Sequence, residues 1–152
     1  MRRWLMKSEP STFGLEHLKA SPNRSTLWDG VRNYQARNML RDDFKRGDLA
    51  FFYHSSCAEP GVVGIIQILC AGYPDPTAFI RNHPHHDPKS SRAAPRWYTV
   101  EVKLKRELTR IISLGELHNH AALAAMPLLR RGNRLSITPV SAAEWDYILA
   151  LE

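Results

Sequence analysis

The sequence lacks long apolar runs and is poor in cysteine. No stretch is long and apolar enough to cross a bilayer, and charges at Lys7 and Glu9 interrupt the start of the chain where a signal peptide needs an apolar core. The two cysteines, Cys57 and Cys70, lack the spacing of a metal site, so we interpret them as buried free thiols. We therefore expect an intracellular protein, cytoplasmic or associated with a nucleoid or nucleus, with no membrane partner.

Motifs for nucleotide hydrolysis and for metal binding are also missing. The sequence contains neither G-x-G-x-x-G nor a phosphate loop, which argues against a nucleotide-hydrolysing enzyme. The run from His83 to Asp87 holds three histidines, but prolines flank it and no expected helix or strand presents the rings. A solvated loop is the better interpretation of this run, and we expect no metal and no cofactor.

Acidic residues are outnumbered. The chain has 21 lysines and arginines against 15 acidic residues, which gives a formal net charge of +6. Most of the basic residues are arginines, whose guanidinium groups match phosphates and base edges. This excess favours a polyanionic partner, chiefly nucleic acid. The alternative, a soluble protein that is basic for no specific reason, stays open on charge alone.

Length and composition indicate one compact domain over residues 1–152, since 43% of the residues are hydrophobic. Hydrophobic patterns predict the strands Arg2–Lys7, Leu49–His54, Val62–Leu69, Trp97–Leu104 and Arg134–Val140. Helical patterns cover Phe13–Ala20, Tyr34–Phe44, a short helix from Ser113, Ala121–Ala125, and a C-terminal helix through Leu151 that starts with the capping box Ser141–Glu144. The proline-rich stretch Tyr73–Pro95 is expected to be an ordered but irregular excursion. We predict an α+β fold of five to six mostly antiparallel strands, curled into a small barrel with short surrounding helices.

The segment from Trp28 to Asn38 is the most informative part of the chain. It combines two aromatic rings, two arginines and three amides around Gly30. Buried polar groups need partners, whereas a plain solvated loop has little need of tryptophan and tyrosine. The mixture suits a surface that holds something flat, polar and anionic, with rings for stacking, amides for edges and arginines for phosphate.

Two polar strand ends are weaker candidates. Lys7 and Glu9 lie two residues apart and share a face of their strand, but a solvated strand end explains these residues as well. After the apolar strand that ends at His54, the hydroxyl of Ser55 or Ser56 can donate to a ligand. No Ser-His-Asp arrangement accompanies them, and a turn that satisfies its own backbone is an equal alternative.

Two further motifs point to nucleic acid. Trp97 follows a proline-rich loop and, paired with Trp28, would form two walls of an aromatic slot, where a stacked base gains roughly 1–3 kcal/mol. Three arginines surround the pair Gly132–Asn133 ahead of the last strand. A charged turn is the plain alternative, but this density of arginine favours phosphate binding.

Six motifs in order resemble the EVE domain, a PUA-like family. They are Trp4–Pro10, Trp28–Asn38, Phe52–Ser55, Tyr73–Thr77, Pro95–Tyr98 and Pro127–Ser136. The resemblance covers essentially the whole chain, and it implies a PUA-like β-barrel, related to YTH readers, with a non-enzymatic pocket for a modified base of DNA or RNA, such as methyl- or hydroxymethylcytosine. The matching positions that would surround the pocket are Lys7, Ser8, Glu9, Trp28, Asn33, Ser55, Trp97, Leu128 and Arg130.

The resemblance also implies a mechanism. The base leaves its stack at a cost of a few kcal/mol, lies between Trp28 and Trp97, and places its methyl group in an apolar corner near Leu128. Four polar side chains would read its edges, namely Ser8, Glu9, Asn33 and Ser55. The flanking phosphates would be held by Arg32, Arg37, Arg130 and Arg131.

Two rival functions stay open from the sequence. A small hydrolase or amidase acting on a modified nucleoside would use Lys7 and Glu9 as nucleophile helper and base. A protein-interaction domain would carry its basic surface incidentally. In each case we expect a monomer.

Overall fold

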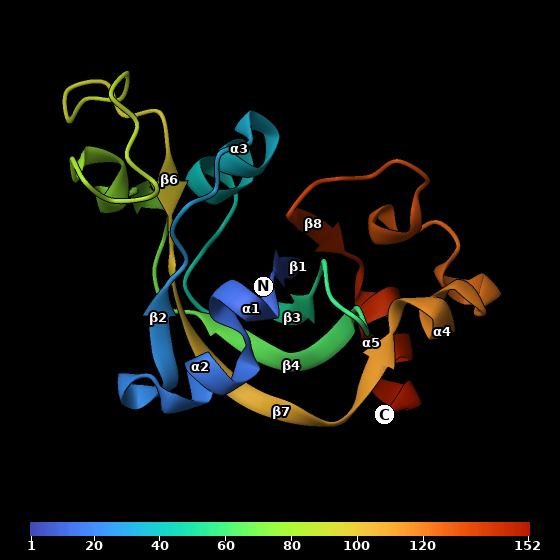
Figure 1. The fold of residues 1–152 in the computed structure, drawn as a ribbon. Helices are drawn as coiled ribbons and strands as arrows, with labels where there is room; N and C mark the ends of the chain where they lie inside the picture. The colour runs from blue at the N-terminus through green and yellow to red at the C-terminus, as the bar shows by residue number, and fades with distance from the viewer.

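A computed structural model describes residues 1–152, and a curled mixed sheet lies at its centre (Figure 1). The six strands follow the order β2-β7-β4-β3-β1-β8. Their bounds are β1 Arg3–Ser8, β2 Ser25–Leu27, β3 Leu49–His54, β4 Gly61–Ile68, β7 Glu101–Ser113 and β8 Ile137–Val140. Neighbouring strands are antiparallel except β1 and β3, which run parallel. The sheet forms a half-barrel, which confirms the predicted α+β class and its mostly antiparallel pairing.

The central strands are apolar on both faces because the sheet separates two cores. Side chains that follow one another along a strand point to opposite faces. Met6 and Phe52 therefore belong to one buried cluster, whereas Leu5 and Phe51 belong to the other. The predicted hairpin of β3 and β4 is confirmed.

The strand β7 is much longer than the sequence predicted. The expectation ended at Leu104, but the strand continues to Ser113 although most side chains beyond Leu104 are exposed. Backbone pairing with β4 holds this polar half in the sheet, and two register shifts between β4 and β7 accompany the curl of the sheet. The sequence did not predict the extension of β7 beyond Leu104, because pairing with a distant strand determines it rather than an apolar pattern.

Short helices cover the edges of the sheet. They are α1 Pro10–Phe13, α2 Leu15–Ala20, α3 Tyr34–Asp42, α4 Leu114–His118 and α5 Ala142–Leu151, with 3-10 turns at Pro22–Arg24, Pro76–Phe79, Ala121–Leu123 and Pro127–Leu129. Extended backbone at Gly14 divides the single helix predicted for Phe13–Ala20. The capping box of Ser141 and Glu144 is confirmed at the start of α5. None of the helices has the length and apolar character needed to span a bilayer.

The excursion loop, residues 75–97, rises from the sheet beside α3 (Figure 1). Its base is closed by the short strands β5 Tyr73–Pro74 and β6 Tyr98–Thr99, which pair with each other. The Trp97 indole N–H donates to the Asp87 carboxylate at 2.7 Å, which ties the end of the loop to its middle. The predicted irregular stretch is thus an ordered lobe.

Candidate functional site

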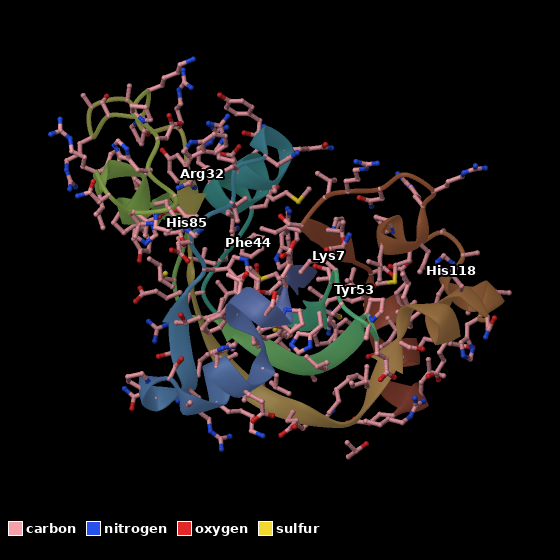
Figure 2. All side chains as sticks on the ribbon, viewed as in Figure 1. Lys7, Arg32, Phe44, Tyr53, His85 and His118 are labelled. Carbon is pink, nitrogen blue, oxygen red and sulfur yellow. The ribbon has the colours of Figure 1, made fainter.

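A cavity of about 400 Å³ opens where β1 ends, between α1, the segment after β2 and the excursion loop. Figure 2 shows Lys7 near the centre of the molecule, with Arg32 and His85 toward the lobe that the excursion loop forms. The lining residues are Lys7, Ser8, Thr12, Phe13, Thr26, Leu27, Trp28, Asp29, Gly30, Val31, Arg32, His83, His85 and Ser136. The cavity thus collects residues that lie far apart along the chain.

The aromatic lining consists of Phe13 and Trp28. Trp28 is only 7% exposed, and its ring meets the ring of Phe52 edge-on at 5.6 Å between centroids. Trp97 is absent from the lining, because its ring packs against Tyr34 at 4.9 Å and lies under the Arg32 guanidinium at 5.4 Å. The structure therefore does not bring Trp28 and Trp97 together as the two walls of one slot.

The buried carboxylate of Asp75 anchors the segment that forms the cavity wall. Its Oδ2 accepts from the Gly30 N–H at 3.0 Å and pairs with the Arg32 guanidinium at 3.0 Å, while its Oδ1 accepts from the N–H and hydroxyl of Thr77. Burial alone would raise the pKa of Asp75, but these hydrogen bonds outweigh burial and lower it overall. The ionised group is therefore the stable form in the fold.

Asp29 and two histidines form the polar wall of the cavity. The His85 Nδ1 lies 3.1 Å from the Asp29 Oδ2, and the His83 Nδ1 accepts from the His85 backbone N–H at 3.0 Å. The run His83–Asp87 is a loop, as predicted, but the rings of His83 and His85 are only partly exposed and line the cavity. The three side chains offer metal-ligand atoms within 4.8 Å of one another. One possible ligand atom of each takes part in the hydrogen bonds above, and the other makes none.

The resemblance placed Lys7, Ser8, Glu9 and Ser55 around one pocket. In the structure Lys7 and Ser8 line this cavity, and all four residues line a second hollow beside it. The Ser8 hydroxyl donates to the Phe13 carbonyl at 2.6 Å, so its proton is engaged within the protein. Lys7 is half-buried, and this burial lowers the pKa of its amine.

Arg32 and Arg37 have structural contacts. Arg32 donates to the His85 carbonyl at 2.6 Å as well as to Asp75, and Arg37 donates to the Arg96 carbonyl at 2.8 Å. Both arginines therefore hold the excursion loop against the segment 28–38. Their predicted role in phosphate binding stays a prediction.

The remaining predicted residues lie outside the cavity lining. Asn33 caps α3, with its Oδ1 accepting from the Gln35 and Ala36 N–H groups. Leu128 is buried in the core cluster that contains Phe51, on the face of the sheet opposite Trp28. Arg130 and Arg131 are exposed on the loop before β8. The structure thus gives Asn33 and Leu128 roles in the fold.

Comparison with known proteins agrees with this fold. The family model described as "EVE domain" matches residues 2–151. The chain belongs to the EVE domain family. Human thymocyte nuclear protein 1 is 46% identical to it over 98% of this chain and 73% of that protein. The resemblance inferred from the six motifs is confirmed.

Two crystal structures of relatives are similar over nearly their whole length. A structure of human THYN1 in complex with DNA containing 5-methylcytosine has a TM-score of 0.93 and 44% identity, covering 99% of this chain and 97% of that one. A protein from Pseudomonas putida has a TM-score of 0.91 and 45% identity, covering 98% of both chains. The half-barrel is therefore the EVE fold.

Sequence reasoning missed several lining residues of this EVE domain. They are Thr12, Phe13, Thr26, Leu27, Asp29, Gly30, Val31, His83, His85 and Ser136. For Asp29 a signal existed, because it lies inside the aromatic and polar run that begins at Trp28. No sequence signal existed for His85, because only the folding of the excursion loop brings its ring next to Gly30.

Gly30→Ala is expected to disturb the cavity wall. Gly30 has a φ of +80°, which disfavours any other residue, and an added Cβ would lie 2.5 Å from the His85 ring. We expect a loss of about 1–3 kcal/mol in the free energy of unfolding, measured by urea denaturation. Gly132→Ala is the matched control, because Gly132 has a φ of +77° but open space around its Cβ position. Equal losses in the two variants would contradict a role for the His85 contact.

Proposed function

We propose that this EVE domain is a non-enzymatic DNA-binding module that takes a 5-methylcytosine base, flipped out of its strand, into the cavity beside Trp28. The observation that carries the proposal is the similarity to human THYN1, whose crystal structure is a complex with DNA containing 5-methylcytosine. The cavity volume of about 400 Å³ falls in the range of small-molecule sites.

The lining suits a flat heterocycle. Phe13 and Trp28 offer ring surfaces, and stacking of a base on an aromatic side chain contributes about 1–3 kcal/mol. Such a gain offsets part of the few kcal/mol that unstacking and unpairing cost. The aromatic contact thus comes from Phe13 and Trp28 rather than from a pair of tryptophans.

Asp29 is the group best placed to identify cytosine. Its Oδ2 is engaged by His85, whereas its Oδ1 accepts no hydrogen bond from the protein. A carboxylate accepts from the exocyclic amine of cytosine, and thymine offers a carbonyl at the same position. We assign the recognition of the amine to Asp29 rather than to Glu9, which the resemblance had placed among the residues that read the edges of the base.

The methyl group would lie against Leu27 and Val31, which are apolar members of the lining. Burial of one methyl-sized group contributes about 0.8 kcal/mol, which corresponds to about fourfold in affinity. The preference for methylated over plain cytosine should therefore be modest. The net charge of +6 adds salt-dependent attraction that does not depend on sequence.

Binding to matched oligonucleotides tests the proposal. Fluorescence anisotropy at fixed salt would compare duplexes that differ only in one central base, as cytosine, 5-methylcytosine or 5-hydroxymethylcytosine, with RNA strands as a second set. We expect the methylated duplex to bind roughly three- to tenfold more tightly than the plain one. A 2-aminopurine placed beside the methylated base should brighten on binding, because flipping unstacks its neighbour. Equal affinities for all duplexes would overturn the proposal.

Chromatography of nucleosides after incubation with the protein distinguishes the proposed binding function from the rival hydrolase function. The protein is incubated with free modified nucleosides, and the proposal expects them unchanged. Conversion that disappears in Glu9→Gln would favour the hydrolase instead. Binding of RNA, the monomeric state and the cytoplasmic location stay predictions.

A further inference from the structure

A second hollow adjoins the cavity and differs from it in chemistry. Its seven lining residues include no hydrophobic side chain, and they are Lys7, Ser8, Glu9, Ser55, Ser56, Arg134 and Ser136. Three of them, Lys7, Ser8 and Ser136, also line the cavity beside Trp28. The two hollows therefore share one wall, and a ligand in one lies next to a ligand in the other.

The topology of the sheet gathers these residues at one edge. β1 and β3 are parallel, so their carboxyl ends meet, with Ser8 beside His54 in the register. The Ser55 N–H donates to the Ser8 carbonyl at 3.0 Å, and the Lys7 N–H donates to the Ser136 carbonyl at 2.8 Å. Backbone pairing thus fixes three chain segments around the polar hollow.

The two cations of this hollow have no partner within the protein. Neither the Lys7 amine nor the Arg134 guanidinium takes part in any of the side-chain hydrogen bonds or ion pairs, in contrast to Arg32 and Arg37. The hydroxyls of Ser55 and Ser56 likewise make no hydrogen bond to the protein, and the φ of +53° at Ser56 marks a sharp turn. Unpaired cations and free hydroxyls together offer donors to an anion.

The charge of the hollow selects the kind of anion. Lys7 and Arg134 carry two positive charges, and Glu9 carries one negative charge without pairing to either of them. The sum of one positive charge complements a phosphodiester, which carries one negative charge. A phosphodiester would therefore leave the hollow with no net charge, whereas a free phosphate dianion would leave one net negative charge there.

We propose, on the basis of the function proposed above, that this polar hollow holds the backbone phosphodiester next to the flipped nucleotide, with Arg134 and Lys7 as its cationic ligands. The base would occupy the cavity beside Trp28, and Lys7 on the shared wall would lie between base and phosphate. Recognition of the modified base and of its own backbone is then joined in one two-part site.

A charge-neutral backbone tests this assignment. A methylphosphonate removes the charge of one chosen phosphate, and it is placed in turn on either side of the 5-methylcytosine. We expect one of the two positions to weaken binding to the unaltered protein about tenfold, or about 1.4 kcal/mol. Arg134→Gln should weaken binding to the ordinary duplex by a similar factor. The methylphosphonate should then cause no further loss of affinity in this variant.

Arg46→Gln is the matched control, because Arg46 is exposed, takes part in no ion pair and lies outside both hollows. It should keep the full response to the methylphosphonate. The proposal would be overturned if both variants lost the same affinity for the ordinary duplex and the methylphosphonate still weakened binding to Arg134→Gln. That result would indicate a diffuse basic surface.

Competition experiments separate the phosphodiester from other phosphates. A dinucleotide with one phosphodiester should displace the labelled duplex, and inorganic phosphate at the same concentration should not. Displacement by both would overturn the phosphodiester assignment in favour of a general anion site. The ratio of affinities for methylated and plain duplexes reports on the proposed function separately. If that ratio is one while Arg134→Gln still removes the effect of the methylphosphonate, the proposed recognition of the methylated base is wrong and the proposed backbone site is supported.

Discussion

Asp75→Ala is expected to lower the free energy of unfolding by about 3 kcal/mol. The Asp75 side chain is fully buried and accepts from Gly30, Arg32 and Thr77 at once. Its removal leaves the Gly30 N–H and the Thr77 N–H and hydroxyl without an acceptor inside the fold, whereas Arg32 keeps two backbone carbonyls. An unsatisfied buried donor costs about 1–3 kcal/mol. Because domains are stable by only about 5–15 kcal/mol, such a loss is a large share of the total.

The acid dependence of stability should change in the same variant. The pKa of Asp75 is lowered in the fold, so its contribution is complete above the pKa of an unfolded aspartate, about 4, and is lost as the pH falls through the folded pKa. Urea denaturation at neutral pH and at several acidic pH values measures both effects. We expect the gap between the unaltered protein and Asp75→Ala to narrow as the pH falls.

Asp146→Ala is the control for this measurement. Asp146 is exposed on α5 and takes part in no ion pair. A surface change of this kind should stay within about 0.5 kcal/mol. If Asp75→Ala were as stable as Asp146→Ala, the anchoring role of Asp75 would be wrong.

Local patterns in the sequence predicted the parts of the fold that neighbouring residues decide. The capping box at Ser141 marks the start of α5, because its two hydrogen bonds join residues three positions apart. The hairpin of β3 and β4 follows from two apolar runs separated by one turn-rich loop. The connections between the predicted strands indicated a curled, mostly antiparallel barrel, the family resemblance implied a β-barrel as well, and the structure shows a half-barrel.

Contacts between distant segments explain what the sequence did not predict. Trp97 and Trp28 are both tryptophans next to a strand, so the sequence does not distinguish them. In the fold, Tyr34 and Arg32 pack against the Trp97 ring, which lies outside the cavity lining. Leu128 is apolar, but which face of the sheet it covers depends on how the loop before β8 returns. Asp29 and Glu9 are both carboxylates in motif segments, so the sequence does not show which of them lines the cavity beside Trp28. Only the fold places Asp29 in that cavity and Glu9 in the polar hollow.

Asp29→Asn is expected to weaken binding of DNA containing 5-methylcytosine by between about 10-fold and about 100-fold. A hydrogen bond to a charged group contributes about 1.5–3 kcal/mol, and the amide offers a weaker acceptor in its place. Anisotropy with the duplexes described above measures the loss. Because plain cytosine carries the same amine, the ratio between methylated and plain duplexes should stay the same.

Thymine makes the test specific for the amine. Thymine and 5-methylcytosine share the methyl group but present a carbonyl and an amine, respectively, at the edge that Asp29 would contact. Measured on single strands, where no base pair has to open, the unaltered protein should prefer 5-methylcytosine to thymine. Asp29→Asn should narrow this preference, because its amide can donate to the thymine carbonyl.

Glu9→Gln is the matched control for this pair of measurements. It makes the same chemical change at an exposed carboxylate of the polar hollow. We expect a change in affinity of less than about fivefold and an unchanged preference over thymine, because one exposed charge contributes about 0–1 kcal/mol. If Glu9→Gln abolished the preference and Asp29→Asn preserved it, the amine would be read from the polar hollow, and the base would lie on the other side of Lys7.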